Sequence, residues 1–214
     1  MDTSSDNTAY AWFDSLYTNA GEDVTKVPWA MPGALPALKN WLNTSEAIRN
    51  KSTAIKSTAV VVGCGLGDDA EAIAQAGYSV TAFDVSPQAI AWAKKRFPHT
   101  TVNYVAADLF NLPEAWKSSF DLAFDFRTIQ ALPISLRTDC IKNIANLGKS
   151  GGTVLIATYL RGEGQNPGEN PPWPLSEQEL AHFETLGLEK VREERSVKKE
   201  SRFSNRTLTQ YRVP

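Results

Sequence analysis

The chain has 214 residues, of which 42% are hydrophobic and 21% are charged. This length predicts one domain with a sizeable core, and the composition excludes a disordered or fibrous chain. The net charge of −2 does not suggest a nucleic-acid partner, because binding to a phosphate backbone favours a strong basic excess. Two cysteines, Cys64 and Cys140, are too few for a disulfide framework, and with two distant histidines they favour no zinc site.

The sequence shows no targeting or membrane signal. The amino-terminal stretch MDTSSDNTAY is polar and acidic, and it lacks the basic start and apolar run of a signal peptide. Val154–Leu160 is one of the longest apolar runs. Such runs are much shorter than the length of about 20 residues that a membrane-spanning helix needs. We therefore expect a cytoplasmic protein with no membrane partner.

The first part of the chain is predicted to be a leader that precedes the core of the domain. Residues 1–9 are expected to be disordered. The spacing of apolar residues in Leu38–Leu42 predicts a short helix, and residues 43–57 are polar enough for a solvated connection. We expect residues 1–57 to form a helical lid segment and residues 58–214 to form the core that binds a ligand.

From residue 58 onward, strand-like and helix-like segments alternate. Short apolar, β-branched runs predict strands at 58–62, 78–83, 102–105, 120–124, 153–159, 188–197 and 205–213. Capping patterns and apolar stripes predict helices that begin at Asp68, Ser86 and Ser176, and another helix at 135–147. This alternation predicts an α/β fold with a Rossmann-like, seven-stranded, mostly parallel sheet and helices on both faces. Ligands bind beyond the carboxyl ends of the strands of such sheets, where the strand order reverses.

The first strand leads into a glycine-rich loop, Gly63-Cys64-Gly65-Leu66-Gly67, which is followed by Asp68 and Asp69. Glycines permit tight turns and close approach to a ligand, and the next helix offers free N–H groups to an anion. Asp68 stands where a dinucleotide fingerprint has its third glycine, and no Walker A lysine is present. An acid there would face a pyrophosphate, so the loop favours a ligand with one carboxylate and a cationic end. S-adenosylmethionine is such a ligand.

Two later acidic residues agree with a nucleoside-type ligand. Asp84 ends the second predicted strand, where a carboxylate can accept hydrogen bonds from both ribose hydroxyls. Asp108 follows the third strand, at a position where it can meet the adenine amino group, and Val85 and Leu109 can enclose the ring. The alternative for each acid is an ordinary turn residue at the surface.

Several segments resemble known methyltransferases. VVGCGLGDDAEAIAQAGYSVTAFDVSPQAI resembles motifs I and II of class I S-adenosylmethionine-dependent methyltransferases. WFDSLY with VPWAMPGALPAL, FDLAFDFRTIQALPISLR and GENPPWPLSEQEL resemble segments of the thiopurine S-methyltransferase family, which includes halide and thiol methyltransferases. The resemblance covers residues 12–42 and 58–180. It implies the class I methyltransferase fold, the cofactor S-adenosyl-L-methionine with S-adenosyl-L-homocysteine as its product, and a small-molecule acceptor.

The motifs and the resemblance together give a set of candidate site residues. Those expected to hold the cofactor are Trp12, Trp29, Gly63, Cys64, Gly65, Gly67, Asp69, Asp84, Val85, Asp108, Leu109 and Asp125. Those expected to contact the acceptor are Trp29, Arg127, Tyr159, Arg161 and Trp173. No residue is assigned as a catalytic acid or base, although Asp125, Arg127 and Tyr159 are candidates for positioning the acceptor. The alternatives are packing roles for the tryptophans and an ion pair of Arg127 with Asp121 or Asp125.

Two features depart from the patterns that they resemble. Ala30, Pro32 and Leu35 stand where the thiopurine family has Asp, Gly and Gln. In that family, the polar side chains of the Asp and the Gln lie near the cofactor and the substrate entrance. These departures bear on the acceptor more than on the cofactor. Asn170-Pro171-Pro172-Trp173 matches the NPPW motif of amino-methyltransferases, but it follows the fifth strand rather than the fourth. We interpret it as a loop that covers the substrate side.

The residue types in the predicted pocket favour a particular kind of acceptor. A thiol, thiolate or halide needs little help from a base, whereas a hydroxyl or amine needs a general base. The predicted pocket loops contain acids and Tyr159 but no histidine, so they favour a soft nucleophile. Small-molecule N- or O-methylation and a non-catalytic S-adenosylmethionine-binding protein are the alternatives, and Asp68 disfavours a nicotinamide oxidoreductase. We expect a monomer or a weak homodimer.

Overall fold

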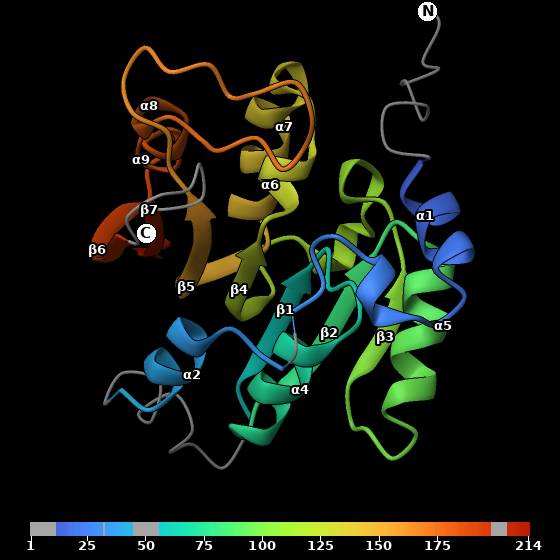
Figure 1. Cartoon of the computed structure of the whole chain (residues 1–214). Helices are drawn as coiled ribbons and strands as arrows, with labels where there is room; N and C mark the ends of the chain where they lie inside the picture. The colour runs from blue at the N-terminus through green and yellow to red at the C-terminus, as the bar shows by residue number, and fades with distance from the viewer. Residues whose placement is uncertain (1–11, 32, 45–55, 198–204) are drawn as a thin grey trace, which may run out of the picture.

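The computed structural model describes residues 12–31, 33–44, 56–197 and 205–214. The expectation for residues 1–9 therefore lies outside the described residues. The strands are β1 (Thr58–Val62), β2 (Ser79–Asp84), β3 (Asn103–Ala106), β4 (Phe120–Phe126), β5 (Gly148–Tyr159), β6 (Glu189–Val197) and β7 (Asn205–Arg212). They form one sheet in the order β3-β2-β1-β4-β5-β7-β6 (Figure 1).

The sheet is parallel from β3 to β5, and β7 runs antiparallel to both of its neighbours, β5 and β6. This confirms the predicted seven-stranded, mostly parallel sheet. β4 and β5 extend beyond their predicted ranges. β4 continues through Asp125 and Phe126, which pair with β5, but polar Asp125 interrupts the apolar pattern of the strand in the sequence. β5 begins earlier than predicted because its glycine-rich start has none of the β-branched or aromatic residues that indicate a strand. A register shift between Phe120 and Leu122 accommodates that irregular start.

Helices follow β1, β2, β4 and β5 as the alternation predicted, and others precede β1. They are α1 (Trp12–Ala20), α2 (Pro36–Leu42), α4 (Asp68–Gln75), α5 (Pro87–Arg96), α6 (Thr128–Ala131), α7 (Ile134–Ala145), α8 (Glu177–Leu180) and α9 (His182–Thr185). Short 3₁₀ turns are η1 (Val24–Lys26), η2 (Leu109–Asn111) and η3 (Glu114–Trp116). The helix expected to begin at Ser176 is divided at Ala181, where α8 ends and α9 begins. None of the described helices is long and apolar enough to cross a membrane.

Two apolar cores lie on opposite faces of the sheet, because successive side chains of a strand point to opposite sides. Val60 and Val62 of β1 belong to the core that includes α6, α7 and α9. Ala59 and Val61 belong to the other core, which includes α2, α4 and α5 (Figure 1). Trp41 of α2 is 1% exposed. It donates through Nε1 to Gln210 of β7 at 2.9 Å, and this bond anchors α2 to the sheet.

The strand order reverses between β1 and β4, which are direct neighbours. Val62 at the end of β1 pairs with Asp125 near the end of β4. The glycine-rich loop and the residues after β4 therefore emerge side by side at the carboxyl edge of the sheet. This is the edge at which a ligand site is expected in an open α/β sheet.

Candidate active site

The glycine-rich loop has a backbone conformation that requires glycine. Gly63, Gly65 and Gly67 have φ angles of +54°, +50° and +91°, a region that residues with a Cβ rarely adopt. A Cβ at Gly63 would lie 2.3 Å from Oγ1 of Thr128, and one at Gly67 would lie 2.3 Å from the hydroxyl oxygen of Tyr104. At these two positions the close approach is to neighbouring side chains of the protein itself.

Cys64 and Asp68 of this segment are partnered or packed within the protein. Burial raises the pKa of the Cys64 thiol well above its ordinary value, so the residue is an uncharged packing group rather than a nucleophile. Both carboxylate oxygens of Asp68 accept hydrogen bonds from Arg96, at 2.6 and 3.0 Å. Because Arg96 compensates this charge, Asp68 repels a pyrophosphate less than an unpaired acid at the same position would.

Asp84 lies at the carboxyl end of β2 with an exposed fraction of 8%. One carboxylate oxygen accepts a hydrogen bond from the backbone N–H of Gly65 at 2.9 Å, and the other accepts one from Ser86 at 3.0 Å. Burial raises the pKa of Asp84, although these backbone donors oppose the shift. A carboxylate has about four acceptor positions, so Asp84 can accept further bonds while it holds the loop in place.

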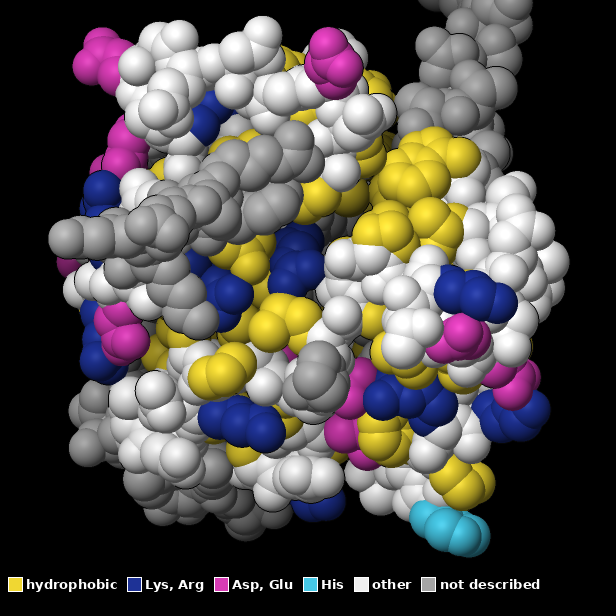
Figure 2. Space-filling model, viewed as in Figure 1, with side chains coloured by type: hydrophobic (Ala, Val, Ile, Leu, Met, Phe, Trp, Pro, Cys, Tyr) yellow, Lys and Arg dark blue, Asp and Glu magenta, His cyan; other side chains and the backbone are white. Residues whose placement is uncertain are grey.

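A cleft with a free volume of about 870 Å³ opens at this edge of the sheet. The candidate residues that line it are Trp12, Trp29, Gly63, Gly65, Asp84, Val85, Asp108, Leu109 and Arg127. An adjoining pocket beside the glycine-rich loop adds Cys64, Gly67 and Asp69. Figure 2 shows hydrophobic side chains gathered around the hollow on this face, with basic side chains beside it. Among the described residues, no cluster of His, Cys, Asp or Glu could hold a metal ion.

Helix α1 is attached to the amino end of α5 by hydrogen bonds. Oδ1 of Asp14 accepts from the hydroxyl of Ser86 at 2.7 Å and from the N–H of Gln88 at 3.2 Å. The Ser86 hydroxyl also caps α5 by accepting from Ala89, and the N–H of the same serine binds Asp84. The attachment of α1 and the position of Asp84 therefore meet at one residue.

Four aromatic side chains of the leader, Trp12, Phe13, Tyr17 and Trp29, line the cleft together. Trp12 and Phe13 are stacked with their centroids 4.0 Å apart, and each presents an edge-to-face contact to Trp29. Trp29 donates through Nε1 to the Tyr17 hydroxyl at 2.8 Å. The sequence pointed to the two tryptophans but not to Phe13 and Tyr17. We call these four residues the aromatic cluster.

Arg127 follows β4 with a φ of +77°, a conformation that costs free energy in a non-glycine residue. Its guanidinium donates to the carbonyl of Trp29 at 2.8 Å and to Sδ of Met31 at 2.7 Å. It also stacks over the Phe126 ring, 4.2 Å from the centroid. The ion pair considered for Arg127 does not form, because Asp121 pairs instead with a lysine. Burial lowers the pKa of Arg127 from its ordinary value.

A second arginine, Arg206 at the start of β7, lies next to Arg127. Its guanidinium donates to the Tyr159 hydroxyl at 2.8 Å, and the Tyr159 ring contacts both guanidinium groups, at 5.2 Å for Arg206 and 5.7 Å for Arg127. Among the described residues, Nε of each arginine is buried without a hydrogen-bond partner. Neither guanidinium has a carboxylate oxygen of the described residues within 4.0 Å as a salt-bridge partner. Two cations are therefore held close together by aromatic rings rather than by acids.

The remaining acceptor-side candidates lie away from the surface of the cleft. Arg161 pairs with Glu179 at 2.6 Å, and the Tyr159 ring packs behind Arg127. The backbone of Trp173 is hydrogen-bonded within the fold, while Pro171 and Pro172 of the same motif line the cleft. The structure thus brings the prolines of the NPPW motif to the cleft.

The positions that depart from the thiopurine family have separate environments. Leu35 is buried in the core, and its backbone N–H donates to Asp69 at 2.7 Å. Burial raises the pKa of Asp69 to about 6. Ala30 lines the adjoining pocket, and Pro32 lies outside the described residues. At these two described positions, an apolar residue replaces a polar one close to the ligand site.

Asp125 is a buried acid just below the cleft. Its side chain is 1% exposed, Oδ1 accepts from the N–H of Thr128 at 3.2 Å, and Oδ2 has no partner among the described residues. Burial raises its pKa from 3.8 to about 7, although hydrogen bonds from Thr128 oppose the shift. Asp125 therefore carries a proton over part of the neutral range.

This proton predicts a pH dependence of stability. Between about pH 4 and about pH 7 the unfolded chain releases the Asp125 proton while the folded protein retains it, so the free energy of unfolding should fall as pH rises. Asp125→Asn cannot ionise and should flatten this slope in thermal melts of the ligand-free protein. Asp23→Asn, which removes an exposed acid, is the matched control. Equal slopes in wild type and Asp125→Asn would contradict the assignment.

Comparisons with known proteins agree with the fold. A methyltransferase domain family model matches residues 59–152. Probable thiol methyltransferase 2 and thiocyanate methyltransferase 1, both from Arabidopsis thaliana, are 25% and 27% identical to this chain. These matches cover 80% and 64% of this chain, and 70% and 58% of the relatives.

Among solved structures, the chain resembles the Burkholderia thailandensis 1,6-didemethyltoxoflavin-N1-methyltransferase with bound 1,6-didemethyltoxoflavin and S-adenosylhomocysteine. The TM-score is 0.73 at 19% identity, over 100% of this chain and 92% of the other. The sheet order, the glycine-rich loop after β1, the acid that ends β2 and the matched domain lead to one assignment. The chain has the fold of class I S-adenosylmethionine-dependent methyltransferases, and its residues 59–152 match a methyltransferase domain.

Proposed function

We propose that this enzyme methylates a small molecule at a soft atom that carries negative charge, such as a thiolate or the sulfur of thiocyanate. The observation that carries this proposal is the pair formed by Arg127 and Arg206, which has no carboxylate partner among the described residues. The pair adjoins the cleft through Arg127. A pair of cations with no salt-bridge partner among the described residues attracts an anion and disfavours a neutral or cationic acceptor.

The cofactor-side residues fit S-adenosylmethionine. In this proposal, Asp84 accepts hydrogen bonds from the ribose hydroxyls, Val85 and Leu109 enclose the adenine, and Asp108 meets its amino group. The backbone beside Gly65 and Gly67 holds the amino-acid end. The fit rests on Asp84, a nearly buried carboxylate that uses only part of its acceptor capacity on backbone donors. When bound, the cofactor supplies an electrophilic methyl group on a positively charged sulfur.

The aromatic cluster lines the cleft. In that position it would exclude water from the methyl group and attract the sulfonium. Aromatic faces favour a nearby cation by about 1 kcal/mol. Arg127 orients this cluster, because it donates to the carbonyl of Trp29. The residue that attracts the acceptor therefore also holds part of the lid, so acceptor binding and water exclusion are linked in the structure.

The arginine pair also explains how the reaction can proceed without a histidine base. A positive charge near a thiol lowers its pKa, because it favours the charged form. Arg127 and Arg206 would therefore stabilise an acceptor thiolate, which is already the reactive form. Displacement at the methyl group then depends on positioning rather than on proton transfer. The relatives named for thiol and thiocyanate methylation support this choice of a soft atom.

Methylation of nitrogen is the second candidate, and one observation favours it. Asp125 is buried, has a pKa of about 7, and leaves Oδ2 without a partner among the described residues. A carboxyl with such a pKa is suited to accept a proton from an N–H acceptor. The structural relative that acts on N1 of its substrate is consistent with this alternative.

The deciding experiment is product detection by mass spectrometry with a methyl-labelled cofactor. The acceptor panel should contain thiols, thiocyanate, halides, nitrogen heterocycles and small carboxylic acids. We expect labelled product from thiols or thiocyanate, with one S-adenosylhomocysteine formed per product. Product from heterocycles alone would replace the soft-atom proposal with N-methylation. Binding of S-adenosylhomocysteine without any product would indicate a non-catalytic binding protein for this panel.

A further inference from the structure

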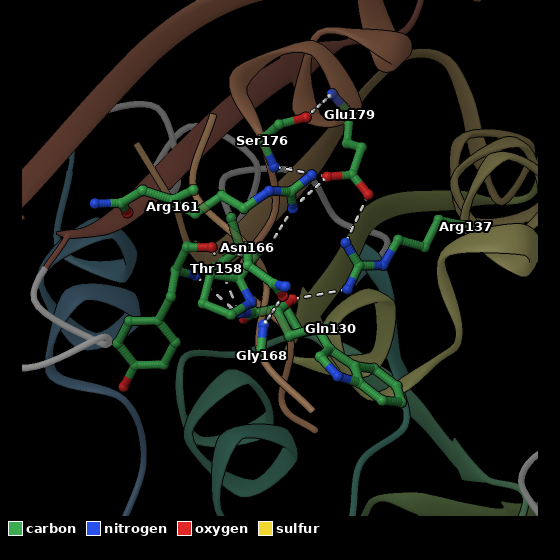
Figure 3. A network of polar contacts seen from close by, with 12 residues as sticks. Gln130, Arg137, Thr158, Arg161, Asn166, Gly168, Ser176 and Glu179 are labelled. Carbon is green, nitrogen blue, oxygen red and sulfur yellow. Dashed lines mark hydrogen bonds and ion pairs between the residues drawn. The ribbon is translucent and has the colours of Figure 1, made fainter. Parts of the chain in front are cut away.

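A partly buried polar cluster lies beside the cleft and has no role in the function proposed above. Glu179 of α8 forms ion pairs with Arg137 of α7 and with Arg161, each at 2.6 Å (Figure 3). Ser176 and Glu179 also form a reciprocal capping box, with hydrogen bonds of 2.7 and 3.1 Å. The Arg137 side chain is only 2% exposed. A single carboxylate thus holds two arginines from separate segments of the chain.

Arg137 contacts two segments of the cleft wall. Its Nη2 donates to the carbonyl of Trp173 at 2.8 Å, and its Nε donates to the carbonyl of Leu132 at 3.4 Å. Leu132 lines the cleft, and so do Pro171 and Pro172, which directly precede Trp173. One guanidinium therefore ties together the loop after α6 and the loop after β5 where both border the cleft.

The loop formed by residues 160–176 is attached to the rest of the fold near Trp173. Near its end, the N–H of Trp173 donates to the carbonyl of Gln130 at 2.8 Å. In its middle, the hydrogen bond of Gly168 is local, because its N–H donates to Asn166 at 2.8 Å. Pro171 and Pro172 thus directly precede Trp173, whose backbone is fixed by hydrogen bonds to Gln130 and Arg137.

We propose that Arg137, oriented by Glu179, is a positioning residue that sets the acceptor side of the cleft and so determines which acceptors fit. This inference rests on the proposed function, in which the acceptor binds beside the cofactor in this cleft. Desolvation offsets much of the attraction in a buried ion pair, so such a pair is a weak source of stability. A planar guanidinium nevertheless fixes the direction of each bond that it donates. The cluster is therefore better suited to fixing geometry than to adding stability.

The test compares two substitutions on the same short helix. Glu179→Gln removes both buried ion pairs but retains the shape of the side chain. Glu177→Gln is the matched control, because it removes an ion pair with Arg195 in which both side chains are exposed, at 57% and 43%. We expect Glu179→Gln to raise KM for a thiol acceptor by about tenfold, since small displacements in a site have effects of this size or larger. The Kd of S-adenosylhomocysteine should change less than about twofold, and the control should match wild type.

A second readout does not depend on turnover. Hydrogen exchange of the amides in residues 162–170 should be faster in Glu179→Gln than in wild type and Glu177→Gln. Arg137→Met, which removes the other partner, should give the same two effects, and the double variant should add little to them. Unchanged KM with faster exchange would overturn the positioning role, and so would unchanged exchange.

If Glu179→Gln does not fold, Arg161→Met leaves the Arg137 pair intact, and a rise in KM there as large as in Arg137→Met would also overturn the positioning role. If the variants show these exchange differences but the wild-type protein methylates no thiol, the result would count against the proposed function alone.

Discussion

Asp84→Ala should weaken the binding of S-adenosylhomocysteine by about 100-fold, because two hydrogen bonds to a carboxylate contribute about 1.5–3 kcal/mol each and the loss is partly offset by water. The same substitution removes the acceptor for the N–H groups of Gly65 and Ser86, so the glycine-rich loop also loses its tether. Isothermal titration calorimetry measures the change directly. The loss should appear in the Kd with wild-type secondary structure retained in circular dichroism.

Two further variants separate the charge of Asp84 from its shape. Asp84→Asn retains one acceptor oxygen but loses the charge, and we expect a smaller loss of about tenfold. Asp23→Ala removes an acid at an exposed turn and should leave the Kd unchanged. If Asp84→Ala binds S-adenosylhomocysteine as tightly as wild type does, then the cofactor lies elsewhere in the cleft.

Arg127→Met should lower kcat/KM for a thiol acceptor by about 100-fold or more, because it removes a partly buried cation that attracts the thiolate and lowers the pKa of the thiol. The pH profile supplies a sharper test than the rate itself. In wild type, the rising limb of kcat should lie below the pKa of the free thiol in the panel, because kcat reports the ionisation of the bound acceptor. In Arg127→Met that limb should shift upward toward the pKa of the free thiol.

Arg206→Met should show the same upward shift to a lesser degree, because Arg206 does not line the cleft and acts from behind Tyr159. Arg127→Lys retains the charge but not the planar group that stacks over Phe126, and it should recover only part of the activity. Arg195→Met, at an exposed position, is the matched control. A pH profile that is identical in wild type and Arg127→Met would exclude a role for this cation in ionising the acceptor.

The part of the cleft that is proposed to hold the cofactor was largely predictable from the sequence, because the residues that line it follow strands within a short stretch of chain. The glycine-rich loop after β1 and Asp84 after β2 each stand at a position that the strand pattern alone defines. The reason for glycine was only partly predictable. Thr128 and Tyr104 crowd the loop, and they come from other strands or helices that local spacing does not locate.

The acceptor side was less predictable, because it depends on contacts between distant segments. Tyr159 and Arg206 are register partners in the antiparallel pairing of β5 with β7, and a lone arginine in a charged stretch carries no signal of that pairing. Arg161 was expected to line the pocket because it follows a strand. The structure pairs it with Glu179 instead. Strand ends predict which residues reach the correct edge, but not which way the following loop directs their side chains.

The antiparallel direction of β7 has a consequence for how new substrate preferences can arise. β7 begins at the edge where the parallel strands β1 to β5 end, so a residue at its amino end reaches the acceptor side without any change to the loops after β1 and β2. The hairpin of β6 and β7 can therefore change the charge presented to an acceptor while cofactor recognition stays intact. Position 206 is accordingly the first place at which to change acceptor selectivity by design.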